Sequence, residues 1–490
     1  MADTHQFLAM DFGAESGRGI LVTLRDGRAE MEELHRFANR PVRLAGTLYW
    51  DLPSLYAEML QAMRLCAEKG AKPASMSIDT WGVDFGLLDE QGKLLTNPVN
   101  YRDARTEGIH EYSNPTMDVS EIFSLTAYEP WPIASLFQLL AMQRDGSPLL
   151  GMANSFLNMP DLLAYFLTGE KRNELSILNT SNLMGTDCRW AEKIIDAFGL
   201  PRGMFGELIS PATQSGVLRA DVAEATGLGE LAVIATCGHD TSAAVAAIPA
   251  EGEDWAFLSC GTWSILGSLI DAPAATPRCL ELGFTNEYTI GGWYIARNIL
   301  GLWLVQELRR KWDTPGDPWD YERMTAAAQS ADAVALVDCS DSSLMAPADM
   351  EEALLALIRT SGQAAPQGRG ALVRCVLESL ALEYAYRMQC VAELTGRKRN
   401  ALYMVGGGIK NRLLCQLTAN ACGVAVHAGA DQCTALGNGL GQALALGVLG
   451  SREEIRDVMR SSTRTETYEP QNADAWAEKR AAYARLQGRG

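Results

Sequence analysis

Four carboxylates in short, glycine-containing segments are the side chains of this sequence that could do chemistry. Asp11 precedes a glycine turn, Asp79 and Asp84 flank a tryptophan and a glycine, and Asp240 follows a histidine. A carboxylate can hold a hydrated magnesium ion, accept hydrogen bonds from sugar hydroxyls, or take a proton as a general base. Phosphoryl transfer needs little more than positioning, magnesium and one such proton acceptor. The carboxylates therefore indicate phosphoryl-transfer chemistry.

Each of these segments also has a structural interpretation. Asp11 could cap the turn after it, and Asp240 could be an ordinary N-cap residue at the start of a helix. In the functional interpretation, Asp11 holds magnesium, Asp240 is the general base and His239 orients the substrate. Trp81 either stacks on the apolar face of a sugar, with Asp79 or Asp84 accepting its hydroxyl hydrogen bonds, or belongs to the core.

Three glycine loops accompany the carboxylates. Residues 9–22 and 256–267 repeat one pattern, an apolar strand, a tight turn and a second strand, and the second turn carries Gly261 and Thr262. Glycine lets backbone N–H groups approach an anion closely, so the repeat predicts a duplicated fold that holds one anion. The loop at residues 405–411 runs from strand to helix but lacks GxGxxG spacing, which disfavours an NAD-dependent dehydrogenase.

Hydrophobic periodicity predicts the elements that position these loops. A helix is expected from Leu52 to about Lys69, with Leu55, Met59, Ala62, Met63 and Cys66 on one face. Residues 101–150 are polar and contain Pro115, Pro130 and Pro132, so they are interpreted as an insertion outside the core. The other expected strands cover residues 6–12, 18–24, 31–37, 75–80, 232–235, 255–270, 292–297, 401–405 and 424–427. The other expected helices include 134–144, 160–168, an amphipathic helix over 370–395, 411–422, 434–447 and 472–487.

Length and composition limit the class of protein. A chain of 490 residues favours two domains, and their expected bounds are 1–248 and 249–490. The formal charge of −18 argues against nucleic acid or an anionic membrane as a partner. The first six residues lack the features of a secretion signal, and no apolar run reaches the length of a membrane span. The eleven cysteines have no metal-binding spacing, so we expect a cytoplasmic protein with reduced thiols.

Taken together, the motifs resemble the FGGY family of carbohydrate kinases, within the actin/hexokinase/Hsp70 ATPase superfamily. The resemblance extends over nearly the whole chain. It rests on residues 11–18, 79–85, 101–105, 159–161, 239–241, 259–264, 298–303 and 405–411. It implies an α/β fold of two RNase H-like domains with a central cleft, the N-terminal half binding sugar and the C-terminal half binding nucleotide.

The same resemblance implies a role for individual residues. Asp240 would be the general base of an ATP-dependent ketose kinase whose expected product is L-rhamnulose 1-phosphate from L-rhamnulose, with Mg²⁺ held by Asp11. The sugar would contact Gly82, His239, Asp240, Thr241 and Asn298. ATP would contact Ala14, Glu15, Ser16, Gly17, Arg18, Thr262, Gln306, Gly407 and Gly408. Glu15 stands where the superfamily usually has a hydroxyl residue, so it contacts either phosphate or a magnesium-bound water.

Several alternatives stay open from the sequence. The sugar could be another ketose, such as L-fuculose or a pentulose, and the active form could be a monomer or a homodimer. A protein of a different class, a non-catalytic nucleotide-gated protein of the actin or Hsp70 type, would be expected to carry a filament interface or a peptide-binding domain. From the sequence, we expect no β-rich appendage after the second half.

Overall fold

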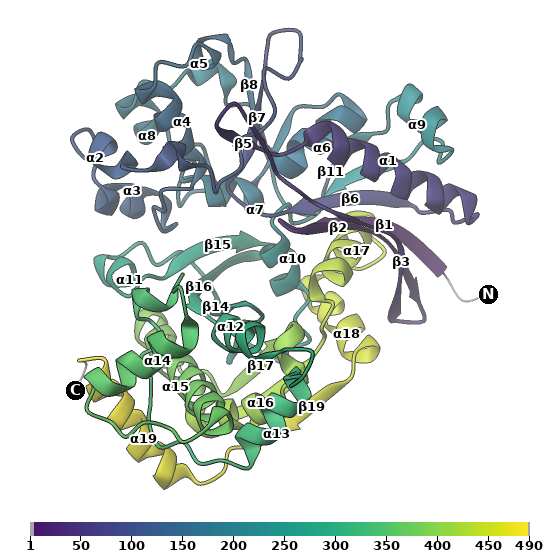
Figure 1. The fold of residues 1–490 in the computed structure, drawn as a ribbon. Coiled ribbons are helices and arrows are strands. Elements are labelled where there is room, and N and C mark those ends of the chain that lie inside the picture. The colour runs from purple at the N-terminus through teal and green to yellow at the C-terminus, as the bar shows by residue number, and fades with distance from the viewer. Residues whose placement is uncertain (1–3, 489–490) are drawn as a thin grey trace. The chain divides into compact units, whose positions relative to one another are not determined.

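The computed structural model describes residues 4–488, so the first three residues of the N-terminal segment considered above lie outside it. The chain divides into two compact units (Figure 1). The first unit contains the chain up to Pro249 together with Ile270–Tyr294 and Gln432–Ser462. The second unit contains Ala250–Leu269, Ile295–Asp431 and the chain from Thr463 onward.

The first unit is built on a six-stranded sheet in the order β11-β12-β6-β1-β2-β3. An antiparallel hairpin, β1 and β2, is extended by β3 on one side, while β6 and β12 continue the sheet in parallel on the other. The strands are β1 (Thr4–Phe12), β2 (Ser16–Arg25), β3 (Arg28–Ala38), β6 (Ser75–Thr80), β11 (Thr213–Val217) and β12 (Ala232–Ala235).

The second unit repeats this order of pairings with β16-β14-β13-β17-β18-β19. Its hairpin β13–β14 is antiparallel, β17 and β18 follow in parallel, and β19 closes the edge antiparallel to β18. The two sheets therefore confirm the predicted duplicated α/β fold. The strands are β13 (Trp255–Cys260), β14 (Trp263–Ile270), β16 (Gly292–Leu300), β17 (Ala401–Val405), β18 (Ala425–Gly429) and β19 (Thr465–Tyr468).

Helices cover both faces of the first sheet, α1 and α6 on one and α17 on the other (Figure 1). The helix α1 (Leu52–Glu68) begins where the Asp51 side chain accepts a hydrogen bond from the Ser54 backbone N–H. All five apolar residues assigned to one face of this helix are buried. On the other face, Gln442 of α17 (Cys433–Ala445) donates to the Leu8 carbonyl over 3.1 Å and accepts from Ser75 over 2.8 Å. These bonds attach α17 to the strands β1 and β6.

Residues 101–150 form a second hydrophobic core in the first unit, so their interpretation as an insertion outside the core is wrong. The prolines lie between the helices rather than within them, and the resulting short helices still pack together. Ile122, Phe123, Leu136 and Phe137 are at most 1% exposed. The helices are α2 (Ile109–Ser113), α3 (Val119–Thr126), α4 (Ser135–Arg144) and α5 (Leu149–Met152).

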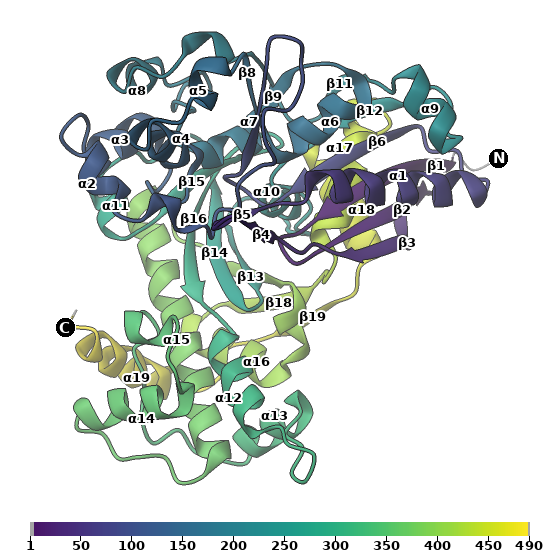
Figure 2. The ribbon, with the colours of Figure 1, turned by 45° about the horizontal axis from the view of Figure 1, so that its top comes forward.

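In the second unit, the long helix α15 (Arg369–Thr395) lies against α13, α16 and α19 (Figure 2). It is buried on most of its circumference rather than amphipathic as predicted, and its buried charges Glu383 and Arg387 pair over 2.6 Å. The surrounding helices are α12 (Trp303–Trp312), α13 (Tyr321–Gln329), α14 (Met350–Thr360), α16 (Arg412–Cys422) and α19 (Ala473–Leu486).

Shorter elements complete the first unit. They are β4 (Val42–Leu44), β5 (Thr47–Tyr49), β7 (Phe85–Leu88), β8 (Ser155–Asn158), α6 (Met159–Thr168), β9 (Arg172–Glu174), α7 (Leu175–Leu178), α8 (Glu192–Ala197), β10 (Glu207–Ile209), α9 (Ala220–Thr226), α10 (Asp240–Ala246), α11 (Pro277–Glu281), β15 (Thr285–Thr289) and α18 (Arg452–Ser462). None of the helices between residues 4 and 488 combines the length and apolar character that crossing a membrane requires. The cysteines of residues 4–488 form no disulfide, and all except Cys188 and Cys422 are buried.

Candidate active site

The first glycine turn is held by an ion pair across the hairpin. Asp11, near the end of β1, lies directly opposite Arg18 on β2, and the two side chains form a short salt bridge. The Arg18 guanidinium also donates to Gln432 over 2.9 Å. Between them, the Gly13 N–H donates to the Ser16 carbonyl over 2.9 Å and closes the turn that carries Ala14 and Glu15. The predicted phosphate-binding residues 14–18 and the predicted magnesium ligand therefore form one local structure.

Asp79 is the residue aligned with Asp11 on the neighbouring parallel strand β6. It is fully buried, and its Oδ2 accepts a hydrogen bond from Asn438 over 2.6 Å, whereas its Oδ1 has no partner among the described residues. Burial, followed by the nearby charge of Asp11, raises the pKa of Asp79 well above its usual value. Asp79 is thus an acidic group inside the sheet, beside Asp11.

The turn after β6 contains Gly82, a predicted sugar contact, followed by a residue with a rare backbone conformation. Gly82 packs so closely that an added Cβ would lie 3.0 Å from the Thr180 methyl group. Val83 follows with φ of 69°, a left-handed conformation that is unusual for a β-branched residue. Its backbone N–H donates to the Thr180 hydroxyl over 2.9 Å. Strain of this kind concentrates at functional sites, and here it lies at Val83, the residue after Gly82.

Trp81 and Asp84 are buried and contact other residues of the first unit, which favours the core interpretation of Trp81 over contact with a sugar. The Trp81 ring packs on Trp50, with ring centroids 4.1 Å apart, and is only 6% exposed. Asp84 is fully buried and accepts hydrogen bonds from Trp50, Trp81 and Gln138 over 2.6, 3.0 and 2.9 Å. These donors hold the Asp84 side chain inside the first unit, away from the surface.

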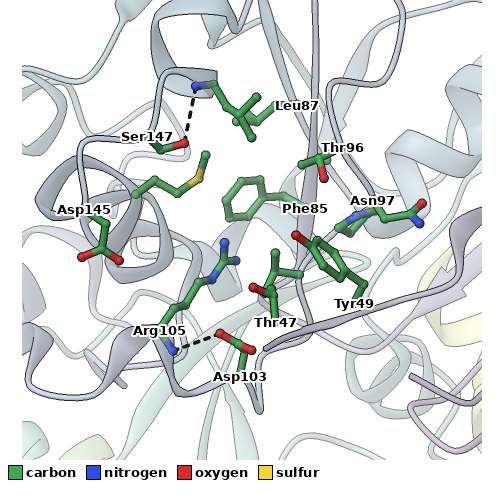
Figure 3. A pocket seen from close by; sticks show the side chains of 15 residues that line it. Thr47, Tyr49, Phe85, Leu87, Thr96, Asn97, Asp103, Arg105, Asp145 and Ser147 are labelled. Atoms are coloured by element: carbon green, nitrogen blue, oxygen red, sulfur yellow. Dashed lines mark hydrogen bonds between the residues drawn. The ribbon is translucent and has the colours of Figure 1, made fainter. Parts of the chain in front are cut away.

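Gln138 links this buried carboxylate to a separate cavity of about 220 Å³ in the first unit. Arg105 points into the cavity beside Phe85 (Figure 3), and its guanidinium also donates to Gln138, which lies outside the lining. The remaining walls include Tyr49, Thr96, Met142 and Leu149. None of the residues predicted to bind sugar, ATP or magnesium lines this cavity.

Asp240 begins α10, with His239 as the N-cap residue. Thr241 donates to Oδ1 of Asp240 twice, from its backbone N–H over 2.5 Å and from its hydroxyl over 3.1 Å. The carboxylate remains one-third exposed. Burial raises the pKa of Asp240, the charge on His239 opposes that rise, and Asp11 adds to it. A carboxylate with an elevated pKa and an accessible oxygen is suited to accept a proton at neutral pH.

A residue that no sequence pattern indicated, Glu287, contacts His239 from the other side. Glu287 on β15 is 5% exposed, and its Oε2 lies 3.0 Å from His239 Nδ1. Burial alone would lower the pKa of His239, but the hydrogen bond and charge of Glu287 outweigh burial and raise it. The polar sequence of this strand gives no local sign that its carboxylate faces a histidine.

In the second unit, the loops after β13 and β17 meet at the same end of the sheet. The Gly261 N–H donates to the Trp263 carbonyl over 3.0 Å, and the Trp303 N–H donates to the Thr262 carbonyl over 3.0 Å. An added Cβ on Gly408 would lie 2.2 Å from Cys260 Sγ, so only glycine fits there. The contacts bring Thr262, the start of α12 and the loop with Gly407 and Gly408 together.

Gln306 lies one turn into α12 and lines a cavity of about 380 Å³ with Arg309, Arg310, Asp313 and Tyr321. The Arg309 guanidinium stacks over the Tyr321 ring at 4.6 Å. Asn298, expected to contact sugar, lies on β16 and belongs to this second unit. Thr262, Asn298, Gln306, Gly407 and Gly408 are thus all in the second unit, and Asp11, residues 14–18, Gly82 and residues 239–241 are in the first.

Comparison with known proteins identifies one family over both halves of the chain. The FGGY family of carbohydrate kinases, N-terminal domain, matches residues 6–247, and its C-terminal domain matches residues 256–446. A rhamnulokinase of Bacteroides thetaiotaomicron is 39% identical over 96% of this chain and 97% of that protein. One of Oceanobacillus iheyensis is 34% identical over 94% of this chain and 97% of that protein. The crystal structure of a ligand-bound xylulose kinase from Lactobacillus acidophilus has the same fold, with a TM-score of 0.83 at 15% identity over 99% of this chain and 98% of that one.

Proposed function

This chain belongs to the FGGY family of carbohydrate kinases, and from that premise we propose that it converts L-rhamnulose and ATP into L-rhamnulose 1-phosphate and ADP. The observation that carries the choice of sugar is the similarity to rhamnulokinases over nearly the whole length of both chains. Family membership favours an enzyme over the non-catalytic actin-like or Hsp70-like alternative.

We propose Asp240 as the general base. The 1-hydroxyl oxygen of the sugar forms a bond to the γ-phosphorus, the bond from that phosphorus to the β,γ-bridging oxygen breaks, and the hydroxyl proton moves to Asp240. Thr241 donates only to Oδ1, so Oδ2 is the oxygen that receives the proton in this scheme. The raised pKa of Asp240 supports the assignment, because it makes the carboxylate a stronger base than an exposed aspartate.

Sugar recognition is assigned in the same proposal to Gly82, His239, Thr241 and Asn298. ATP recognition is assigned to residues 14–18, Thr262, Gln306, Gly407 and Gly408. The support is local: turns closed by backbone hydrogen bonds, a glycine that packs on Cys260, and Gln306 at the edge of a cavity. Each of these arrangements offers backbone N–H groups or polar side chains to a polar ligand.

Magnesium fits the residues of the first hairpin. Between residues 4 and 488 there is no group of three His, Cys, Asp or Glu side chains able to hold a metal, but Mg²⁺ usually needs only one or two carboxylates together with waters and phosphates. Asp11 supplies such a carboxylate, and Asp79 beside it has an oxygen without a partner. We therefore assign magnesium to Asp11, with Glu15 near enough in sequence to contact a bound water or a phosphate. When bound, the ion would neutralise charge on the ATP phosphates.

A coupled assay of ADP release with L-rhamnulose, L-fuculose, L-ribulose and D-xylulose tests the substrate. We expect the highest kcat/KM with L-rhamnulose. A higher value for L-fuculose or a pentulose would support the alternative substrate, and no activity with any ketose would contradict the proposal. Because the phosphoryl donor is ATP, we place the activity in the cytoplasm. We expect a monomer or a homodimer, which light scattering distinguishes.

A further inference from the structure

The buried carboxylate of Glu287 has no part in the chemistry proposed above, yet it contacts the neighbour of the proposed base. We propose that Glu287 is a positioning residue that keeps His239 in its cationic form, and that this cation keeps Asp240 ready to accept the substrate proton. The inference rests on the proposed function, because it takes Asp240 as the base. It adds a residue that acts on the base through His239.

Glu287 is held in place from two sides. Its Oε2 accepts a hydrogen bond from the Tyr294 hydroxyl over 2.6 Å and lies 3.0 Å from His239 Nδ1. The Tyr294 oxygen is also 3.1 Å from the Ser242 hydroxyl on α10. A carboxylate that is 5% exposed is costly unless donors surround it. The observed contacts therefore fix both the position of Glu287 and its direction toward the imidazole.

The contact with Glu287 determines which nitrogens of His239 carry protons. Nδ1 faces a carboxylate, so it is the nitrogen that donates. Nε2 lies 3.6 Å from Oδ1 of Asp240. With a proton on each nitrogen, the imidazolium stands between two carboxylates and is attracted by both. The direction of the His239 pKa, raised despite burial, agrees with this arrangement.

Other titratable groups also act on His239 and Asp240. Glu174, the N-cap of α7, acts on His239 as a further negative charge, and its Oε2 already accepts a hydrogen bond from the Gly238 N–H over 2.9 Å. Asp11 of β1 raises the pKa of Asp240, and Asp240 in turn interacts with Asp79 of β6 and with Tyr101. Of the carboxylates that act on His239 from outside α10, Glu287 is the one within 3.0 Å of the ring. Glu287 is therefore the residue whose charge a substitution should remove to test the inference.

The variant Glu287→Gln keeps the shape and an oxygen that can accept from Nδ1, but it removes the charge. The pKa of His239 should fall, which an NMR titration of the five histidines measures without substrate. Loss of the cation should raise the pKa of Asp240, so the acidic limb of the kcat profile should move to higher pH. At neutral pH we expect kcat to fall about tenfold and to recover partly at higher pH. Glu281→Gln, whose carboxylate is 68% exposed on α11, is the matched control and should change neither measurement.

A double-mutant cycle separates action through His239 from a general structural effect. In a His239→Gln background, Glu287→Gln should have almost no further effect on kcat. An equal loss of kcat with and without His239, an unchanged pKa of His239, or an unshifted acidic limb would each overturn the inference. If Glu287→Gln does not fold, His239→Gln alone must move the acidic limb to higher pH, and an unmoved limb overturns the inference. A protein that phosphorylates no ketose but shows the expected fall in the His239 pKa would instead contradict the proposed function alone.

Discussion

The substitution Gly407→Ala separates nucleotide binding from protein stability at the loop after β17. Gly407 does not have a positive φ, and an added Cβ would meet no protein atom within 4 Å. The folded protein should therefore tolerate alanine, with a free energy of unfolding unchanged or raised by up to about 1 kcal/mol because alanine restricts the unfolded chain. If ATP lies along this loop, the methyl group occupies space that the nucleotide needs. We expect KM for ATP to rise about tenfold, equivalent to about 1.4 kcal/mol of binding free energy.

Two other glycines of the second unit provide the controls for this prediction. Gly316, in the same unit, also has open space around its Cβ position, so Gly316→Ala should change neither stability nor KM for ATP. In Gly408→Ala the new Cβ would lie 2.2 Å from Cys260 Sγ, and overpacking should cost about 1–3 kcal/mol. The measurements are chemical denaturation and ATP saturation at fixed sugar concentration. An unchanged KM for ATP in a stably folded Gly407→Ala protein would refute the assignment of this loop to the nucleotide.

Three further substitutions test the first unit. Arg18→Gln leaves Asp11 without its ion pair. We therefore expect the free energy of unfolding, measured by denaturation, to fall by about 1–3 kcal/mol, and KM for ATP to rise. Unchanged values of both would exclude the role assigned to Arg18 in ATP recognition. Asp84→Asn replaces an acceptor of several N–H groups and should lower the free energy of unfolding by about 3 kcal/mol. A loss below about 0.5 kcal/mol would show that the hydrogen bonds to Asp84 do not stabilise the protein. Asp79 has a folded-state pKa raised above the usual 3.8, so its favourable contribution to stability is complete below that pH and is lost as pH rises through the folded-state value. The melting temperature of Asp79→Asn, relative to that of the wild-type protein, should therefore be higher at pH 8 than at pH 5. An equal difference in melting temperature at the two pH values would contradict the raised pKa of Asp79.

The elements that depend on local sequence were predicted well. The apolar face of α1 follows from helical spacing alone, and Leu55, Met59, Ala62, Met63 and Cys66 are all buried. The two glycine hairpins were recognisable because strand, turn and strand are contiguous in the chain. Their repetition was enough to predict a duplicated fold, since each hairpin starts a sheet with the same order of pairings.

Contacts between distant segments were not predictable from the same patterns. The partner of Asp79 is Asn438, 359 positions away, and Gln432 reaches Arg18 across 414 positions. Trp81 looked available for a sugar because its packing partner, Trp50, lies in a separate segment. Glu287 was missed for the same reason, since a carboxylate in a strand gives no local sign that a histidine will face it. Local patterns thus identified the glycine loops and the hairpins that carry them, but not the distant side chains that hold them in place.

The most direct test of the account compares the wild-type protein with Asp240→Asn on L-rhamnulose and ATP. The wild-type protein should phosphorylate the 1-hydroxyl, as identified by NMR of the product. The variant should lose about 10²-fold or more in kcat, because asparagine has no carboxylate to take the proton, while sugar binding measured by calorimetry stays within about threefold. A variant that turns over at nearly the wild-type rate would remove Asp240 from the role of base. A wild-type protein that leaves L-rhamnulose unchanged would contradict the proposed substrate.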